Sequence, residues 1–226
     1  MTPTRLIDAT AVRDNWWLIR IAWQAPLPQP GQWLWLEIDD HRFCLPVRDA
    51  DATEGWLAGV VPGVCLNTTP GPGTLAKVSA LRGEAVTPAH QDDWLLLGED
   101  LGIGPALALA ERYPGQTRLV LLGGRHGMPA RLAPSRFFIP ALADVAIAGI
   151  PHLEQLGVPA RIALADERPG VYEGQVMELL GRYLGDMPPS ERQSLRLVAF
   201  GPWGTLEQQR HGLEASVGSA QLIELP

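Results

Sequence analysis

A glycine-punctuated turn is the feature of this chain whose residue types and spacing most directly indicate chemistry. An apolar run at 95–97 leads into Gly98, Gly102 and Gly104, and a helical pattern follows from Pro105. Glycines let the backbone turn sharply and approach a ligand, and the first turn of a helix presents free N–H groups to an anion. The spacing predicts a phosphate-binding turn, although a tight strand-to-helix connection has the same pattern.

Composition indicates an ordinary globular protein. The 226 residues are 46% hydrophobic and 19% charged, which excludes disorder and allows one large domain or two smaller ones. The net charge of −7 and a single lysine, Lys77, argue against a nucleic-acid surface. We find no apolar run long enough to span a membrane and no leader pattern at the N-terminus, so we expect no membrane association and a cytoplasmic location.

The two cysteines do not suggest a metal centre. Cys44 and Cys65 lie far apart and have no neighbouring Cys or His at ligand spacing, so we interpret both as small buried hydrophobic residues. Two cysteines are too few for the four-thiolate ligation of an iron–sulfur cluster within this chain.

The pattern of elements that would position the glycine turn changes near residue 92. Before it, short apolar or alternating runs separated by Pro and Gly turns predict an antiparallel barrel or sandwich. After it, apolar strands alternate with helical patterns, which predicts a parallel sheet. We therefore predict two domains, 1–91 and 92–226. The expected strands are 6–12, 16–23, 33–38, 42–47, 56–61, 76–80, 95–97, 119–122, 160–165, 195–200 and 221–225, and the expected helices are 105–112, 137–144, 174–183 and 205–214.

Several motifs together resemble those of the ferredoxin–NADP reductase superfamily and, within it, the electron-transfer subunit of bacterial dihydroorotate dehydrogenase. They occur in the family's order and cover nearly the whole chain. The matching stretches are Pro30-Gly-Gln-Trp33, Gly71-Pro-Gly-Thr74, the turn from Gly98 to Pro105, Asp166 to Gly174 with the residues that follow, and Phe200-Gly-Pro202.

This resemblance implies a β-barrel followed by a nucleotide-binding α/β domain. FAD would lie between the two domains, and NAD(P)H would deliver hydride to it. The reduced flavin would then pass electrons to a partner protein. By this resemblance the FAD-binding residues are Pro46, Val47, Arg48, Gly71, Gly73 and Thr74, and the nicotinamide-nucleotide residues are Gly102, Gly104, Pro105, Gly201 and Pro202.

The flavin motif departs from the family pattern. Where the family has Arg-Pro-Tyr/Phe-Ser, this chain has Leu45-Pro-Val-Arg48. Leucine cannot pair with a phosphate, and Val47 cannot stack as an aromatic ring does. Arg48 could stabilise a reduced anionic flavin, and Arg42 or Arg48 could reach the pyrophosphate by another route.

The nucleotide region departs as well. Phe200 replaces a family cysteine beside the nicotinamide, and no cysteine cluster follows the nucleotide domain. Glu99 and Asp100 bring negative charge into a turn that is largely glycine in the family. We interpret Asp100 either as a capping or turn residue or as a nucleotide contact.

Other residues near the expected strand ends have two interpretations each. Arg125 is either a partner for the 2′-phosphate of NADPH or a solvated loop residue. The loop of Asp166, Glu167 and Tyr172 either approaches the cofactor or is a solvated turn. Trp203 could cover or fill a nicotinamide pocket, whereas most tryptophans are expected in the core. None of the five histidines, His90 among them, shows a metal or triad pattern.

Two functions remain open on the sequence. The first is a flavin-dependent NAD(P)H oxidoreductase or electron-transfer subunit, with a protein electron acceptor or catalytic subunit as partner. The second is a reductase-like binding or scaffolding subunit without flavin, because fold alone does not establish chemistry. Retention of the nucleotide without flavin is a third alternative, and a homodimer is an assembly that we also consider.

Overall fold

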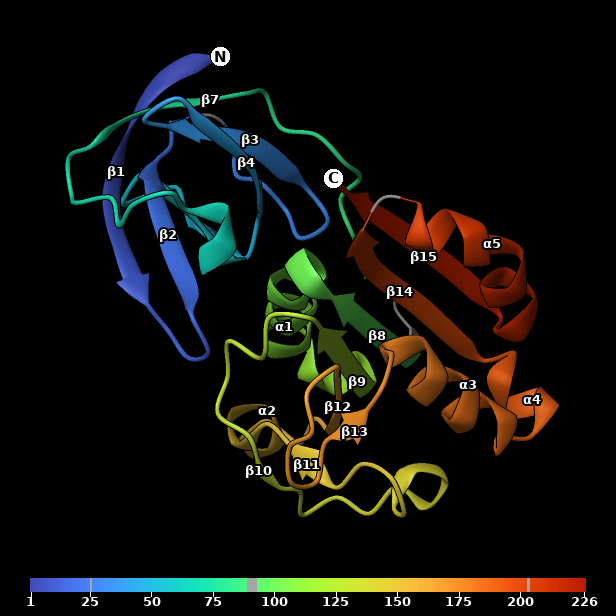
Figure 1. Cartoon of the computed structure of the whole chain (residues 1–226). Helices are drawn as coiled ribbons and strands as arrows, with labels where there is room; N and C mark the ends of the chain where they lie inside the picture. Colours follow the sequence, from blue (N-terminus) through green and yellow to red (C-terminus); the bar gives the residue numbers. More distant parts are fainter. Residues whose placement is uncertain (25, 89–92, 203) are drawn as a thin grey trace.

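The computed structural model describes residues 1–24, 26–88, 93–202 and 204–226 of the chain. Two sheets organise these residues (Figure 1), and the first belongs to residues 1–88 and the second to residues 93–226, here called the barrel half and the α/β half. The domain boundary predicted at 91/92 and His90 lie outside the described residues.

An antiparallel sheet of seven strands forms the barrel half within the described residues. Its order is β4-β3-β7-β1-β2-β6-β5, and the short β5 is an addition to the predicted set. The sheet curls until β4 and β6 touch, and Gly59 permits this approach, because a Cβ there would lie 2.4 Å from the Pro46 carbonyl oxygen. The strands are β1 (Thr2–Ala11), β2 (Trp16–Ala22), β3 (Trp33–Ile38), β4 (His41–Pro46), β5 (Asp49–Asp51), β6 (Trp56–Pro62) and β7 (Leu75–Val78).

A parallel sheet of six strands lies at the centre of the described α/β half. Its order is β13-β12-β9-β8-β14-β15, so the predicted fold class, an antiparallel barrel followed by a parallel-sheet domain, is confirmed. The apolar runs at 95–97 and 119–122 form its buried centre, as expected for strands covered on both faces. The strands are β8 (Asp93–Glu99), β9 (Thr117–Gly124), β12 (Ala160–Leu164), β13 (Tyr172–Glu173), β14 (Leu195–Pro202) and β15 (Ser219–Leu225).

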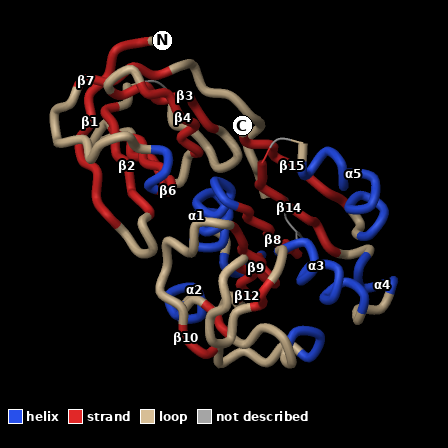
Figure 2. The backbone as a smooth tube through the Cα atoms, viewed as in Figure 1, coloured by secondary structure: helices blue, strands red, loops and turns tan. Residues whose placement is uncertain are grey.

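Helices cover both faces of the parallel sheet (Figure 2). α1 (Ile103–Arg112) and α2 (Pro151–Gln155) pack in one apolar cluster, and α3 (Val176–Gly185) and α5 (Thr205–Ser216) pack in a second cluster. The short α4 (Pro189–Arg192) precedes β14. In the described residues, no helix combines the length and the apolar character needed to cross a bilayer.

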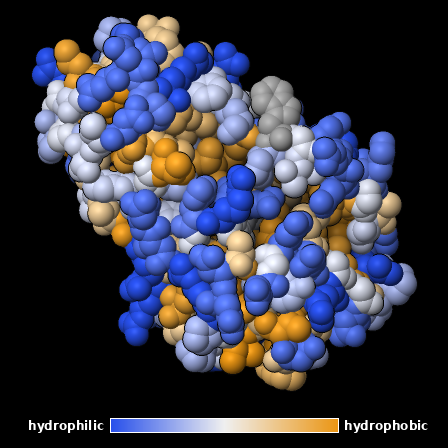
Figure 3. All heavy atoms as spheres, in the orientation of Figure 1, coloured by the Kyte–Doolittle hydropathy of each residue, from blue (hydrophilic) through white to orange (hydrophobic). Residues whose placement is uncertain are grey.

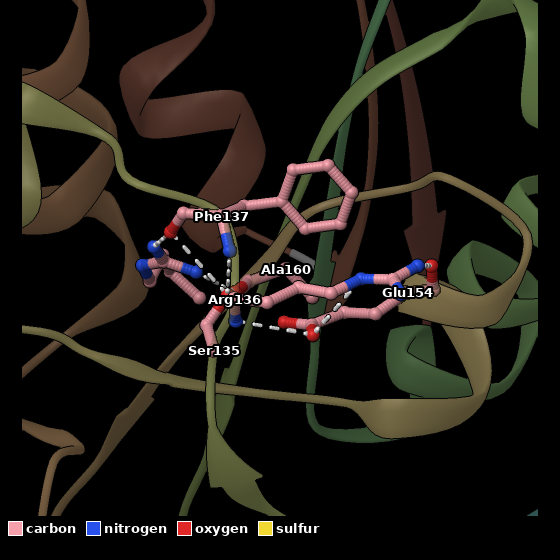
Figure 4. Close-up of polar contacts among 6 residues, drawn as sticks. Ser135, Arg136, Phe137, Glu154 and Ala160 are labelled. Carbon is pink, nitrogen blue, oxygen red and sulfur yellow. Dashed lines mark hydrogen bonds and ion pairs between the residues drawn. The ribbon is translucent and has the colours of Figure 1, made fainter.

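The helix predicted at 137–144 was wrong. Only a 3₁₀ turn, Pro140–Leu142, forms there, between the paired short strands β10 (Ala133–Pro134) and β11 (Ala148–Gly149). Side chains take up the local backbone groups (Figure 4): the buried Arg161 donates to the Phe137 and Ala160 carbonyl oxygens. Arg136 donates to the Glu154 carbonyl oxygen, and its own N–H donates to the Glu154 carboxylate at 3.2 Å.

The two halves share one apolar cluster. Trp16, Trp33 and Val60 of the barrel half pack with α1, which Figure 1 shows between the barrel and the parallel sheet. In Figure 3, apolar residues gather on the side of the barrel half that faces the α/β half. Polar contacts also join the halves: Asp14 pairs with Arg168, and the Trp16 indole N–H donates to the His126 carbonyl oxygen at 2.8 Å.

Candidate functional site

A cleft of about 610 Å³ lies at the carboxyl ends of the parallel strands. Strands β8, β9 and β14 and the residue after β12 open into it, as does the first turn of α5. The chain proceeds from β8 to β9 and β12 in one direction and returns on the other side of β8 with β14, so the cleft lies at the point where ligands bind in open α/β sheets. This position makes the cleft the candidate ligand site of the α/β half.

The glycine turn is used for packing of the chain against itself. A Cβ on Gly102 would lie 2.2 Å from the Phe200 carbonyl oxygen, so β14 already occupies the space beside this glycine. Gly104 faces Val60 of β6, where a Cβ would make an ordinary contact at 3.6 Å, and Pro105 is buried in the first turn of α1. These three positions, which we predicted to contact the nicotinamide nucleotide, lie against β14, the barrel or the helix core.

Asp100 holds the loop that follows β9. It has a φ of +49°, is 7% exposed, and accepts the Arg125 backbone N–H at 2.9 Å. Its other carboxylate oxygen pairs with the Arg125 guanidinium at 3.1 Å. Asp100 therefore caps no helix, and the charge of Arg125, which we predicted as a 2′-phosphate partner, is matched inside the chain.

Glu99 adds a second carboxylate to the cleft. Its Oε2 atom is buried and has no hydrogen-bond partner among the described residues. Burial raises the pKa of the Glu99 carboxyl, the Asp100 charge raises it further, and Arg125 opposes the rise. Glu173 also lines the cleft, so three carboxylates face one guanidinium.

The remaining cleft residues offer few donors for an anion. The first turn of α3 is closed by a reciprocal capping box between Gln175 and Glu178, and Tyr172 donates to that same glutamate at 2.8 Å. The first turn of α5 has no side-chain cap, and Thr205 lines the cleft there. The first turn of α5 and Thr205 thus offer donors to a diphosphate, whereas the three carboxylates of the cleft oppose it by charge repulsion.

The end of β14 carries the other predicted nucleotide residues. Pro202 lines the cleft, and a Cβ on Gly201 would lie 3.6 Å from the buried Glu99 oxygen. Phe200 is fully buried in the apolar cluster beneath. Trp203 lies outside the described residues, and Asp166 and Glu167 are exposed, consistent with a solvated turn.

Two side chains of the expected flavin motif, Leu45 and Val47, point into the barrel rather than toward its outer face. Leu45 and Val47 are 0% and 1% exposed and pack inside the barrel with Phe43. The outward side chain near this point of β4 is Arg42, which stacks over the Trp35 ring at 4.6 Å. Val47, which we predicted to contact FAD, is therefore enclosed, and the adjacent Pro46 is buried as well.

Arg48 is paired within the chain. Its guanidinium donates to both carboxylate oxygens of Glu111 on α1, at 2.9 and 3.0 Å. The His152 ring nitrogen lies 3.7 Å from the same carboxylate. The positive charge that could stabilise a reduced flavin is therefore balanced by a side chain from the other half.

The Gly71, Gly73 and Thr74 turn lies on the surface before β7. A Cβ built on either glycine would meet nothing within 4 Å, and the Thr74 hydroxyl donates to the Gly71 carbonyl oxygen at 2.6 Å. The turn has free space on its solvent side. Its assignment to the FAD phosphates remains a prediction.

Part of the seam between the halves, beside the glycine turn, is packed with this chain's own residues. Leu101, from the glycine turn, packs against both the barrel core and the cluster that contains α1. Cys65 lies nearby, and burial, with the Asp100 charge second, raises the pKa of its thiol to about 11. Leu101 packs at this part of the seam, and Leu45 and Val47 point into the barrel. These side chains do not form the surface on which an isoalloxazine ring would stack.

Sequence reasoning missed Glu111 and Leu101. Nothing in the sequence links Arg48 with a residue 63 positions later, and a leucine within a glycine turn is an ordinary packing residue. The side of β4 that faces the barrel core could have been predicted. Phe43, Leu45 and Val47 lie at every second position, so they share one face of the strand.

Comparison with known proteins places the fold. No family model and no curated protein matches the chain. Among solved structures, the cytochrome P450 reductase of Amycolatopsis superposes with a TM-score of 0.70 at 12% identity, over 98% of this chain and 68% of that one. The ferredoxin reductase in carbazole 1,9a-dioxygenase gives a TM-score of 0.70 at 12% identity, over 99% and 68%.

A third match has the same length as this chain. It is the flavohaem-like FAD/NAD-binding domain of nitric oxide dioxygenase from Vibrio cholerae, with a TM-score of 0.62 at 15% identity, over 99% of both chains. These superpositions establish the fold: a curled antiparallel sheet followed by a parallel sheet with helices, as in ferredoxin reductase-like structures. Special closeness to the dihydroorotate dehydrogenase subunit remains a prediction.

Proposed function

We propose that this chain is a reductase-fold binding subunit that works without flavin. The observation that carries the proposal is the Arg48–Glu111 ion pair, together with Leu45 and Val47 turned into the barrel core. Leu45, Val47 and Arg48, at which the family's barrel-strand motif would grip FAD, make internal contacts here instead.

The strand-end cleft supports the same conclusion. Glu99, Asp100 and Glu173 face a single guanidinium, and that guanidinium is already paired. Bringing a diphosphate among these carboxylates would oppose binding by charge repulsion. We therefore expect weak NADH or NADPH binding.

The partner that we propose is a protein of an electron-transfer system, such as a catalytic subunit. The support is the fold, because the matched structures include reductases named for a cytochrome P450 and a dioxygenase. In this role the chain would contribute a surface for assembly, and another protein would carry the redox cofactor.

A second candidate is the flavin-dependent NAD(P)H oxidoreductase predicted from the family resemblance. One observation favours it: Arg42 is exposed on the outer face of β4, and the Gly71–Thr74 turn has open space beside it. In this alternative Arg42 would pair with the FAD pyrophosphate in place of the family arginine.

The test is the visible absorption spectrum of the purified protein, followed by FAD titration and anaerobic addition of NADH or NADPH. We expect no flavin band and no saturable FAD binding. A stoichiometric flavin band that bleaches with either nicotinamide would overturn the proposal. Loss of that band in Arg42→Gln, with retention in the control Arg192→Gln on α4, would then assign the grip to Arg42.

A further inference from the structure

A second cavity, of about 460 Å³, lies between the two halves on the side of α1 and α2. Its apolar walls come from both halves: Leu18 and Val60 from the barrel strands, and Leu107 and Ile150 from the α/β half. Val12, 37% exposed, stands at its edge. Volume, apolar lining and position at a domain interface are those of small-molecule sites.

Polar groups meet at one part of this cavity. Arg48, Glu111 and His152 form a linked set in which the Glu111 carboxylate serves both neighbours. Arg131 also lines the cavity, and within the described residues its guanidinium has no hydrogen bond or ion pair. Among the arginines and carboxylates that line the cavity, Arg48 and Arg131 face the single Glu111, so one positive charge is unmatched.

We propose that this cavity binds a small monocarboxylate with an aromatic or branched apolar body. The body would lie against the aliphatic walls, and its burial would supply most of the affinity. The carboxylate would pair with Arg131, whose planar guanidinium matches two carboxylate oxygens. Glu111 is occupied by Arg48 and disfavours a ligand with a second negative charge.

This site is separate from the strand-end cleft. The two cavities share no lining residue, and their charges are opposite, because the cleft is acidic and this cavity carries excess positive charge. The inference therefore does not depend on whether the strand-end cleft binds a nucleotide.

The test uses 2-naphthoate as the probe and isothermal titration calorimetry of the full chain. We expect saturable binding at one site, and binding at least tenfold weaker for the neutral analogue 2-naphthamide. Arg131→Gln is expected to weaken 2-naphthoate binding about tenfold, whereas Arg192→Gln, a matched change away from the cavity, leaves it unchanged.

A second variant tests the location without removing charge. Val12→Trp places a larger side chain at the exposed edge of the cavity, where we expect the fold to tolerate it. We expect this variant to weaken the binding of both 2-naphthoate and 2-naphthamide. Circular dichroism checks that each variant is folded. Absence of saturable 2-naphthoate binding, or binding that neither Arg131→Gln nor Val12→Trp weakens, would overturn the proposal.

Discussion

The two halves of this molecule differ at the positions where the sequence predicted ligand contacts. In the barrel half, Leu45 and Val47 lie inside the core, so these two side chains are not available to a flavin. In the α/β half the strand-end cleft is still open, but its lining has become acidic. One half differs from the expected site in the direction of its side chains, and the other differs in its charge.

This difference shows how a fold can persist when its expected ligand contacts change. Arg48 and Arg125 each pair with a carboxylate of the same chain, so neither charge is left unmatched. Arg48, Glu111 and Asp100 are largely buried, so an unpaired charge at any of them would destabilise the protein, and the internal pairs offset that cost. The following experiments test whether this account holds in each half.

The largest effect is expected from Leu45→Arg, which restores the family's arginine. Because position 45 faces the barrel core, the new charge would be buried without a partner and should lower the free energy of unfolding by about 4 kcal/mol or more. Urea unfolding followed by circular dichroism measures this, with Leu45→Met as the control. Wild-type stability together with FAD binding would mean that position 45 faces a flavin site.

A smaller effect is expected from Glu111→Gln. It removes the charge that balances the half-buried Arg48 and should lower the free energy of unfolding by about 1–2 kcal/mol. The matched control is Glu214→Gln on α5. If this variant acquires tight FAD binding, the pair alone was keeping flavin out, and the barrel half has retained more of a site than its packing indicates.

The cleft is tested by neutralising its carboxylates. The double variant Glu99→Gln, Asp100→Asn keeps the side-chain shapes and the acceptor for the Arg125 N–H while removing two negative charges. We expect ADP-ribose, which carries a diphosphate, to bind about tenfold more tightly than to the wild type. Calorimetry measures the change, and an unchanged affinity would mean that charge is not what distinguishes this cleft.

The smallest effect concerns Asp14, which joins the halves. Burial alone would raise the pKa of its carboxyl, but the Met128 N–H and Arg168 hold that pKa below the ordinary value of 3.8. A folded-state pKa that is lowered stabilises the protein above the ordinary pKa, and this contribution is lost as the pH falls through the folded-state value.

Asp14→Asn should therefore lower the free energy of unfolding by about 1 kcal/mol at pH 7. The gap between variant and wild type should close as the pH falls below 3.8, which urea unfolding at both pH values measures. A gap that persists in acid would assign the contribution to hydrogen bonding alone.

The sequence predicted elements better than the partners of side chains. Periodicity and turn residues predicted the longer strands and α1, α3 and α5, since these depend on local patterns. The short strands β5, β10, β11 and β13 and the short helices α2 and α4 were not predicted. The helix predicted at 137–144 does not form. The Phe137 carbonyl oxygen there accepts a hydrogen bond from Arg161, on a strand that is distant in the sequence. The Arg48–Glu111 and Arg125–Asp100 pairs link residues 63 and 25 positions apart, and no local pattern specifies such contacts.

The hydrogen bond from Trp16 to the His126 carbonyl has a spectroscopic consequence. Trp16 is fully buried where the halves meet, so their separation would transfer an indole from an apolar environment into water. Its fluorescence emission would then move to longer wavelength before the sheets themselves unfold. The spectrum of Trp16→Phe, subtracted from that of the eight-tryptophan chain, isolates this signal, so the chain carries its own optical reporter of interdomain opening.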